Sequence, residues 1–208
     1  MAEVELWTDD DWISPYVFSV FVALTEKGVP FDVRALSLDL GEQNDATYRD
    51  ASITARVPAL RHGDFWLSES TAIVEYVDEV FPGVHLLPRD PHERARVRQV
   101  MGWVRSDLGA LREERPTTTM FYERAKTPLS DAGEAAAKKL VRVALALVPE
   151  GRESIGQHWS IGDADLAFML HRLILNGHPV PSRLMAYAAT TWRRASVRAF
   201  VDRPRTKR

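Results

Sequence analysis

The sequence contains no cysteine among its 208 residues. Without a thiol, the protein can form no disulfide and can offer no thiolate as a nucleophile or a metal ligand. Any thiol chemistry must therefore arrive with a ligand. The six histidines are scattered along the chain without the spacing of a metal site, and no glycine-rich phosphate loop is present. We therefore expect no metal.

Long apolar runs and a strong excess of one charge are also missing. No apolar stretch approaches the roughly 18 residues of a membrane span, and the acidic N-terminus lacks the basic start of a secretory signal. With 27 Lys and Arg against 29 Asp and Glu, the formal net charge is −2, which disfavours nucleic acid as a partner. We expect a cytoplasmic protein that binds neither membranes nor nucleic acid. The basic end, residues 203–208, is interpreted as a solvated, frayed terminus.

Two kinds of pattern divide the chain. In the first part, short alternating segments and helical segments follow one another in the order β-α-β and then β-β-α. In the second part, only the three- and four-residue spacing of amphipathic helices remains. A linker rich in Pro and Gly lies between them. We predict a first domain over residues 1–83 and an all-helical domain over residues 90–208.

The boundaries of the expected elements follow from apolar periodicity and from capping residues. The expected strands are 3–7, 31–38, 59–61 and 65–67. The expected helices are 15–27, a short one near 46–48, 70–81, a long one that carries the apolar stripe 97–111, 130–148, 161–176 and one or two within 181–202.

Three short motifs sit where a strand or loop meets the next element. Ser14 followed by Pro15 is the preferred order at a helix start, a cap and then the first helical position. Val57-Pro58 precedes a short strand and can hold a cis peptide, with a backbone edge that can pair with a peptide. Glu69-Ser70 stands where a strand hands over to a helix. Its side chains and free amides can hold the charged ends of a small zwitterion.

A fourth motif, Ser160-Ile161-Gly162-Asp163, has the form of a capping box at the start of a core helix. We assign Ser160 and Asp163 to structure. Losing the box should cost about 1 kcal/mol of helix stability or more.

In this order and spacing, the motifs resemble the cytosolic glutathione S-transferase family, and the resemblance covers essentially the whole chain. It implies an α/β thioredoxin-like, glutathione-binding domain followed by an all-helical glutathione-transferase domain. Longer stretches are most similar to the bacterial YfcF-type members of the family. These stretches are Ile13-Ser14-Pro15-Tyr16, Glu26-Lys27-Gly28, Leu67-Ser68-Glu69-Ser70, Arg105-Ser106-Asp107-Leu108 and Arg112-Glu113-Glu114-Arg115-Pro116.

The resemblance implies that Ser14 is catalytic, with its hydroxyl stabilising the thiolate of bound glutathione. Tyr16 lies close enough in sequence to be an alternative for this task. Without the other motifs, the simpler interpretation of Ser14 is a plain helix cap. The chain departs from the family's isomerase branch, whose Ser-Ser-Cys start is replaced by Trp12-Ile13-Ser14-Pro15.

The resemblance also implies how glutathione is held. The main chain of Val57 would pair with the cysteinyl part, and Glu69 and Ser70 would hold the γ-glutamyl end. Arg56 would contact the glycyl carboxylate, with Glu42 and Gln43 as weaker candidates. The simpler interpretations are a strand-edge residue at Val57 and a plain N-cap at residues 69–70.

The implied function is conjugation of small electrophiles with glutathione, or glutathione-dependent reduction of peroxides or disulfides, by a homodimer with glutathione as co-substrate. The absence of cysteine excludes the branch of the family in which a protein thiol forms a mixed disulfide. An alternative of another class is a binding or scaffold protein that kept the fold without the chemistry. Arg105, Arg112 and Arg115 lie along one end of the same expected helix. Arg112 and Arg115 are expected to pair with Glu113, Glu114 or a second subunit, or else to meet an anionic substrate.

Overall fold

The computed structural model describes residues 3–205. The chain divides into two compact units. Among the described residues, the first unit runs up to Leu86 and also includes residues 199–205, and the second unit spans Leu87–Arg198. Each unit has its own hydrophobic core.

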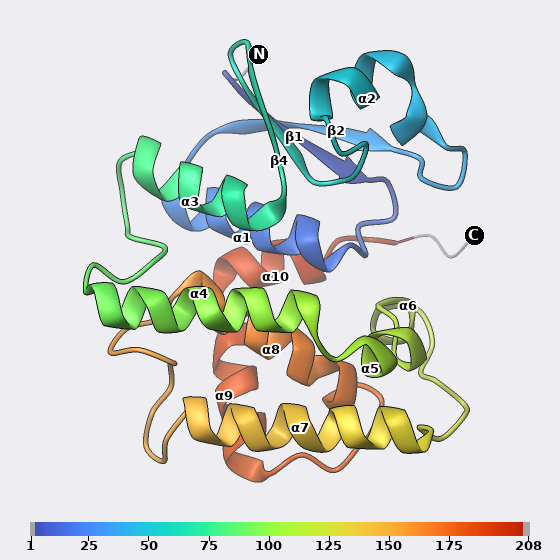
Figure 1. Cartoon of the computed structure of the whole chain (residues 1–208), viewed down its shortest axis with the longest axis vertical. Coiled ribbons are helices and arrows are strands. Elements are labelled where there is room, and N and C mark those ends of the chain that lie inside the picture. The colour runs from blue at the N-terminus through green and yellow to red at the C-terminus, as the bar shows by residue number, and fades with distance from the viewer. Residues whose placement is uncertain (1–2, 206–208) are drawn as a thin grey trace. The chain divides into compact units, whose positions relative to one another are not determined.

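The first unit is built around a four-stranded sheet in the order β2-β1-β3-β4. β1 pairs with β2 in parallel, and the pairs β1–β3 and β3–β4 are antiparallel. Helices α1 and α3 lie side by side on one face, and α2 lies on the other (Figure 1). This is the predicted thioredoxin-like arrangement. The elements are β1 (Val4–Asp9), α1 (Pro15–Lys27), β2 (Phe31–Leu36), the 3₁₀ turn η1 (Glu42–Asn44), α2 (Ala46–Ser52), β3 (Ala59–His62), β4 (Phe65–Ser68) and α3 (Ser70–Val80).

The end of α1 is tied to the segment that leaves the unit. The ammonium of Lys27, whose side chain is 1% exposed, forms an ion pair of 2.9 Å with Asp78. It also donates to the Val84 carbonyl at 2.9 Å. Gly83 has a φ of 119°, and a Cβ there would lie 2.9 Å from the Lys27 carbonyl oxygen, so only glycine fits. The Pro- and Gly-rich segment is therefore held against the first unit up to this point.

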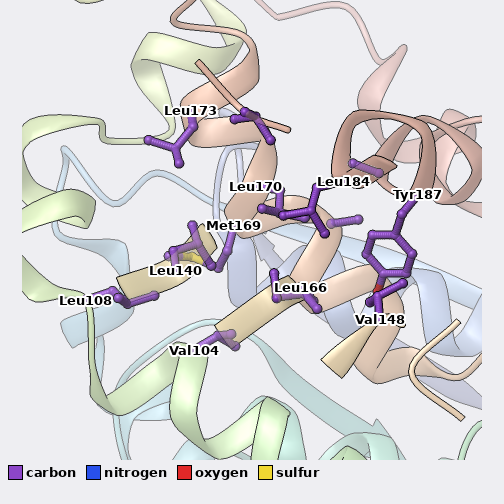
Figure 2. Packing of buried hydrophobic residues seen from close by; sticks show 14 of the residues in the cluster. Val104, Leu108, Leu140, Val148, Leu166, Met169, Leu170, Leu173, Leu184 and Tyr187 are labelled. Atoms are coloured by element: carbon purple, nitrogen blue, oxygen red, sulfur yellow. The ribbon is translucent and has the colours of Figure 1, made fainter. Parts of the chain in front are cut away.

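In its described residues, the second unit consists of helices and the segments that connect them, as predicted. Figure 2 shows its core, in which Leu140, Leu166, Leu170 and Leu184 from three helices meet at 0% exposure. None of the helices described in residues 3–205 is long and apolar enough to cross a membrane. The helices are α4 (Pro91–Ser106), α5 (Gly109–Glu114), α6 (Thr118–Phe121), α7 (Asp131–Leu147), α8 (Ile161–Ile174), α9 (Ser182–Trp192) and α10 (Ala195–Val201), of which the last runs back into the first unit.

The long helix expected over the stripe 97–111 is wrong, because the chain breaks between α4 and α5. Leu108 adopts a left-handed conformation with a φ of 60°. The Asp107 carboxylate accepts the Leu108 N–H at 2.7 Å and the Trp103 indole N–H at 2.9 Å, and it also pairs with Lys139. These bonds replace the helical ones. Leu108 and Leu111 nevertheless stay buried, which explains why the apolar spacing continues across the break.

The capping box at the start of α8 is present, as predicted. One oxygen of Asp163, Oδ2, accepts from the backbone N–H of Ser160 at 2.8 Å and from its hydroxyl at 2.9 Å. The other oxygen accepts from the Ile155 N–H at 2.7 Å and the Tyr187 hydroxyl at 2.9 Å. Burial raises the pKa of the Asp163 carboxyl, which is 0% exposed. The box thus joins a helix, a loop and α9.

Arg105 forms an ion pair with Asp165 at 2.6 Å, a partner that the sequence did not predict, whereas the ion pairs expected of Arg112 and Arg115 are replaced by other bonds. Arg112 donates instead to the backbone carbonyl of Arg105. Arg115 is 2% exposed and donates to His178 Nε2 at 2.9 Å and to the Thr127 carbonyl at 2.8 Å. The last two are therefore held by neutral acceptors.

The basic end of the chain differs from the expected solvated terminus over residues 203–205. Arg203 and Arg205 contact Trp12 in the first unit, and Arg205 also donates to three carbonyls of its own segment. Residues 206–208 lie outside the described residues.

Candidate functional site

Three segments that carry the predicted site residues leave the sheet at the same end. In the strand register, Trp7 of β1 lies opposite Ala59 of β3, and Ala59 lies opposite Ser68 of β4. The loop that follows β1, the segment that precedes β3 and the turn that follows β4 therefore emerge together. Ser14, Val57 and the pair Glu69–Ser70 all lie in these segments. The sheet topology brings the candidate site residues of the first unit to one end of the sheet.

Ser14 is the N-cap of α1, as predicted, and Pro15 takes the first helical position. Its hydroxyl oxygen accepts the Val17 N–H at 3.3 Å, and the side chain is half-buried. Within residues 3–205, the Ser14 hydroxyl donates its own proton to no partner. The positive end of the 13-residue helix favours negative charge at this place. The arrangement offers a hydrogen-bond donor to an anion. Tyr16, the alternative residue, lies two positions after Ser14 and is 37% exposed.

Asp9, the last residue of β1, is a site residue that sequence reasoning missed. The carboxylate is 2% exposed, and its Oδ2 accepts the Ile13 N–H at 2.7 Å and the Ser14 N–H at 3.2 Å. Its Oδ1 is buried and has no partner among the described residues. Burial raises the pKa of Asp9, and the two backbone donors oppose that rise. An aspartate at the end of an apolar strand was the available signal, hidden by the acidic residues that follow.

Val57 and Pro58 are joined by a cis peptide bond, as the sequence predicts, directly before β3. Val57 is partly buried against a small cluster that includes Trp7 and Trp66. The Arg56 side chain is exposed, and only its carbonyl, which accepts from Tyr48 at 2.7 Å, is held by a described residue. The position of the Arg56 guanidinium is therefore not fixed by the fold.

Tyr48 of α2 is a second residue that sequence reasoning missed. Its hydroxyl anchors the Arg56 carbonyl, and its ring lies 5.2 Å from that of Trp7, centroid to centroid. Burial raises the pKa of the phenol, so Tyr48 stays a neutral donor. It is the one aromatic residue in the polar stretch 42–54, which was the signal for a buried role. Glu42, a weaker candidate, has its carboxylate engaged by the Ser37 N–H at 2.7 Å.

Glu69 and Ser70 lie at the start of α3. Ser70 is the first helical residue and is 4% exposed, whereas the Glu69 side chain is exposed. Glu69 has a φ of 70° and a ψ of 114°, a conformation that side chains other than glycine rarely adopt. Strain of this kind at a non-glycine residue clusters at functional sites. The Glu69 backbone thus adopts a strained conformation at the start of α3.

No group of His, Asp and Glu in residues 3–205 is arranged to hold a metal ion. The site offers instead a hydroxyl, two helix starts and a backbone edge, which are groups that bind a small charged peptide.

Two family models match the chain. The glutathione S-transferase N-terminal domain matches residues 13–80, and the glutathione S-transferase C-terminal domain matches residues 90–204. The chain belongs to the glutathione S-transferase family. The family explains the pairing of a thioredoxin-like unit with a helical one, and the sheet end described above lies in the part that matches the N-terminal domain of the family.

Named relatives agree with this assignment. Glutathione S-transferase Z1 of Arabidopsis thaliana is 30% identical over 188 residues, which cover 85% of this chain and 82% of the relative. A probable maleylacetoacetate isomerase 2 of Drosophila melanogaster is 36% identical over 102 residues, 48% of this chain and only 45% of the relative's length.

Solved structures share the whole architecture. A glutathione transferase homologue from Burkholderia, solved with bound glutathione, is 37% identical, covers 96% of both chains and superposes with a TM-score of 0.80. A maleylacetoacetate isomerase from Methylobacterium extorquens, solved with malonate and glutathione, is 26% identical with a TM-score of 0.74 and covers 96% of this chain and 98% of its own.

Proposed function

We propose that this transferase binds glutathione and uses the Ser14 hydroxyl to stabilise the glutathione thiolate. The observation that carries the proposal is the uncommitted proton of Ser14 at the N-terminus of α1. The chain has no cysteine, so the reacting sulfur must belong to the ligand. The Burkholderia homologue with bound glutathione supports the choice of ligand.

The chemistry begins with the thiol. A free thiol has a pKa near 8.5 and is mostly protonated at neutral pH. A hydroxyl donor and a helix N-terminus both favour the anion. Lowering the thiol pKa by about 2 corresponds to about 2.7 kcal/mol of preferential stabilisation of the thiolate.

The thiolate then attacks an electrophile. With a substrate R–X, the S–C bond forms as the C–X bond breaks, and X⁻ leaves with the electron pair. With a hydroperoxide, the sulfur takes the terminal oxygen and releases an alcohol, and a second glutathione converts the sulfenic acid to glutathione disulfide and water. A disulfide substrate is attacked directly by the thiolate, since no protein cysteine is available. A mixed disulfide with glutathione forms as the substrate's S–S bond breaks and one thiolate leaves, and a second glutathione releases the other thiol and forms glutathione disulfide. Glutathione is thus a co-substrate.

The tripeptide is held, in this proposal, by the other residues of the sheet end. The main chain of Val57 exchanges hydrogen bonds with the cysteinyl residue, as an added strand would. Ser70 and the free amides of α3 receive the γ-glutamyl carboxylate, and the Glu69 carboxylate receives the ammonium. The strained backbone of Glu69 supports this assignment. The exposed guanidinium of Arg56 contacts the glycyl carboxylate.

We assign the chain further to the YfcF-type members and propose a cytoplasmic homodimer. The support is the longer similarity in sequence, which includes residues 13–16 and 67–70 around the site.

A second candidate is a glutathione-dependent cis–trans isomerase. The isomerases of Drosophila and Methylobacterium among the similar proteins favour it. In that reaction the thiolate adds to a conjugated double bond, the new single bond rotates, and elimination restores both the double bond and glutathione. Residues 12–15 differ from the Ser-Ser-Cys start of that branch, which favours conjugation or reduction.

The test combines binding with turnover in the wild-type protein and in Ser14→Ala and Tyr16→Phe variants. Calorimetry with glutathione should register binding in all three. An aryl halide, an organic hydroperoxide, a glutathione mixed disulfide and maleylacetoacetate distinguish the four activities. We expect Ser14→Ala to lose turnover about a hundredfold, the change that matches the thiol pKa above, and Tyr16→Phe to keep it.

Binding without any turnover would favour a non-catalytic binding protein with the same fold. Absence of binding at millimolar glutathione would contradict the proposal, and loss of activity in Tyr16→Phe with retention in Ser14→Ala would move the role to Tyr16.

A further inference from the structure

The end of the chain contacts the loop that carries Ser14. Arg205 Nε donates to the Trp12 carbonyl at 2.9 Å, across a separation of 193 residues. The guanidinium of Arg203 lies 3.7 Å from the centre of the Trp12 ring. These residues and Trp12 belong to the same compact unit. Trp12 stands two positions before Ser14, so the contact reaches the backbone that leads directly into the site.

One peptide group of this loop is held at both ends. The Trp12 carbonyl and the Ile13 N–H belong to the same peptide, which is planar. Arg205 donates to the carbonyl oxygen, and Asp9 Oδ2 accepts the N–H at 2.7 Å. A cation and an anion therefore fix the orientation of this plane. The next peptide is fixed as well, because the same Asp9 oxygen accepts the Ser14 N–H at 3.2 Å.

The conformation held in this way is not a relaxed one. Trp12 has a φ of 56°, in the left-handed region that non-glycine residues rarely occupy. Such a conformation persists only where its surroundings over-determine it. The Trp12 ring packs edge-on against Phe21 and Phe200, with centroids 5.6 and 5.7 Å apart. Residues 200–205 thus supply three contacts to the strained Trp12: the Phe200 ring, the Arg203 guanidinium on the indole face and the hydrogen bond from Arg205.

Arg205 is well suited to act as a rigid clamp. Its Nη1 donates to the carbonyls of Val201 and Arg203, and its Nη2 donates to the carbonyl of Phe200, each at 2.9 Å. The planar fork is therefore fixed by its own segment before it meets Trp12. A lysine has one rotatable ammonium in place of this fork and cannot make the same set of bonds.

We propose that Arg205, with Arg203 against the Trp12 ring, is a positioning residue of Ser14. The clamp on the Trp12–Ile13 peptide sets where the Ser14 hydroxyl stands relative to the glutathione sulfur. The inference rests on the proposed function, because it concerns how well that hydroxyl stabilises the thiolate. It gives the C-terminal segment a part in the chemistry rather than in folding alone.

The test is the pH titration of the thiolate absorbance of bound glutathione in Arg205→Ala, Arg205→Lys and Arg203→Ala. The matched control is Arg194→Ala, because Arg194 lies 4.0 Å above the ring of Trp159 in the second unit, the same kind of contact away from Ser14. Ser14→Ala is titrated in parallel. S-methylglutathione, which has no thiol, reports on docking by calorimetry.

We expect Arg205→Ala to raise the thiol pKa by about one unit, so that the thiolate fraction and the turnover below that pKa fall about tenfold. Arg205→Lys should fall between Arg205→Ala and the wild type, and Arg203→Ala should show a smaller shift in the same direction. Affinity for S-methylglutathione should change less than twofold, and Arg194→Ala should follow the wild type.

A wild-type titration curve in folded Arg205→Ala, alongside a shifted curve in Ser14→Ala, would overturn this inference and leave the proposed function intact. Should Arg205→Ala fail to fold, a wild-type curve in both Arg205→Lys and Arg203→Ala would have the same meaning. An unshifted curve in Ser14→Ala would overturn the proposed function, and this inference with it.

Discussion

Two helices of this protein begin with a serine near a buried aspartate, and the two starts use the same groups differently. At α8, Ser160 is 1% exposed and its hydroxyl donates to Asp163, all of whose oxygens are occupied. At α1, Asp9 holds only backbone N–H groups, and the Ser14 hydroxyl keeps its proton. In the first arrangement the serine hydroxyl is paired within the protein, and the bonds stabilise the core of the second unit. The second leaves one donor for a ligand.

The comparison teaches that a serine cap is not in itself a sign of chemistry. What distinguishes the two is where the aspartate directs its oxygens. At α8 the carboxylate reaches the hydroxyl, and at α1 it stops at the backbone. The position of the aspartate also differs, three residues after Ser160 and five residues before Ser14.

The largest effect on stability is expected at the start of α8. Asp163→Ala should lower the free energy of unfolding by about 3 kcal/mol, because it leaves several buried donors without a partner. Denaturant unfolding measures the loss. The control is Ser130→Ala at the start of α7, where the hydroxyl accepts the Gly133 N–H and donates to the Glu114 carboxylate, and a loss of about 1 kcal/mol is expected. Equal losses in the two variants would contradict the comparison.

The second effect concerns pH and the same helix. His171 is 5% exposed, and burial lowers its pKa from 6.5 to about 4. The folded state therefore binds fewer protons than the unfolded state between these values, and stability should fall as pH drops from 6.5 towards 4. The full loss is about 3 kcal/mol. Unfolding measured across this window should show it in the wild type.

The matched variants are His171→Gln and His158→Gln, since His158 is exposed in the same unit. The first should flatten the pH dependence in this window, and the second should keep it. A curve in His171→Gln as steep as that of the wild type would sink this assignment.

A third, smaller effect separates docking of the tripeptide from activation of its thiol. Tyr48→Phe removes the bond to the Arg56 carbonyl and should cost about 1 kcal/mol of stability. It should also weaken binding of S-methylglutathione a few-fold, because Val57 loses its anchor. The thiol pKa of bound glutathione should not move. A shift of that pKa would mean that docking and activation are not separable.

The smallest effect is expected at Glu69, and it has the opposite sign. Glu69→Gly should raise the free energy of unfolding by up to about 1 kcal/mol, since glycine relieves the strain at a φ of 70°. Glutathione binding should weaken at the same time, because the partner of the ammonium is lost. Glu69→Gln keeps the strain and loses the charge. It should weaken binding without raising stability, and tighter binding in either variant would contradict the role given to Glu69.

Local chemistry explains which features the sequence could predict. Ser14-Pro15 at one end of α1 and Gly28, with a φ of 70°, at the other end act through bonds within a few residues. The capping box at Ser160 is of the same kind. The apolar spacing likewise predicts strands and helices in the first unit and helices alone in the second.

The remaining features depend on contacts that no local pattern encodes. Trp12 and Arg205 are separated by 193 residues, and Tyr48 reaches Arg56 only because α2 folds back on the sheet. The left-handed turn at Leu108 occurs at a residue type that does not favour it, and bonds from Asp107 stabilise it. The site residues were thus predictable where they cap helices and hidden where tertiary packing positions them.

The most direct measurement is the pH titration of the thiolate absorbance of glutathione bound to the wild type, to Ser14→Ala and to Ser130→Ala. Both variants remove a serine from a helix start, so the comparison separates the effect of Ser14 on the thiol from the loss of a helix cap. The account predicts that the thiol pKa rises towards about 8.5 in Ser14→Ala and keeps its wild-type value in Ser130→Ala. Superimposable curves for all three proteins would contradict it.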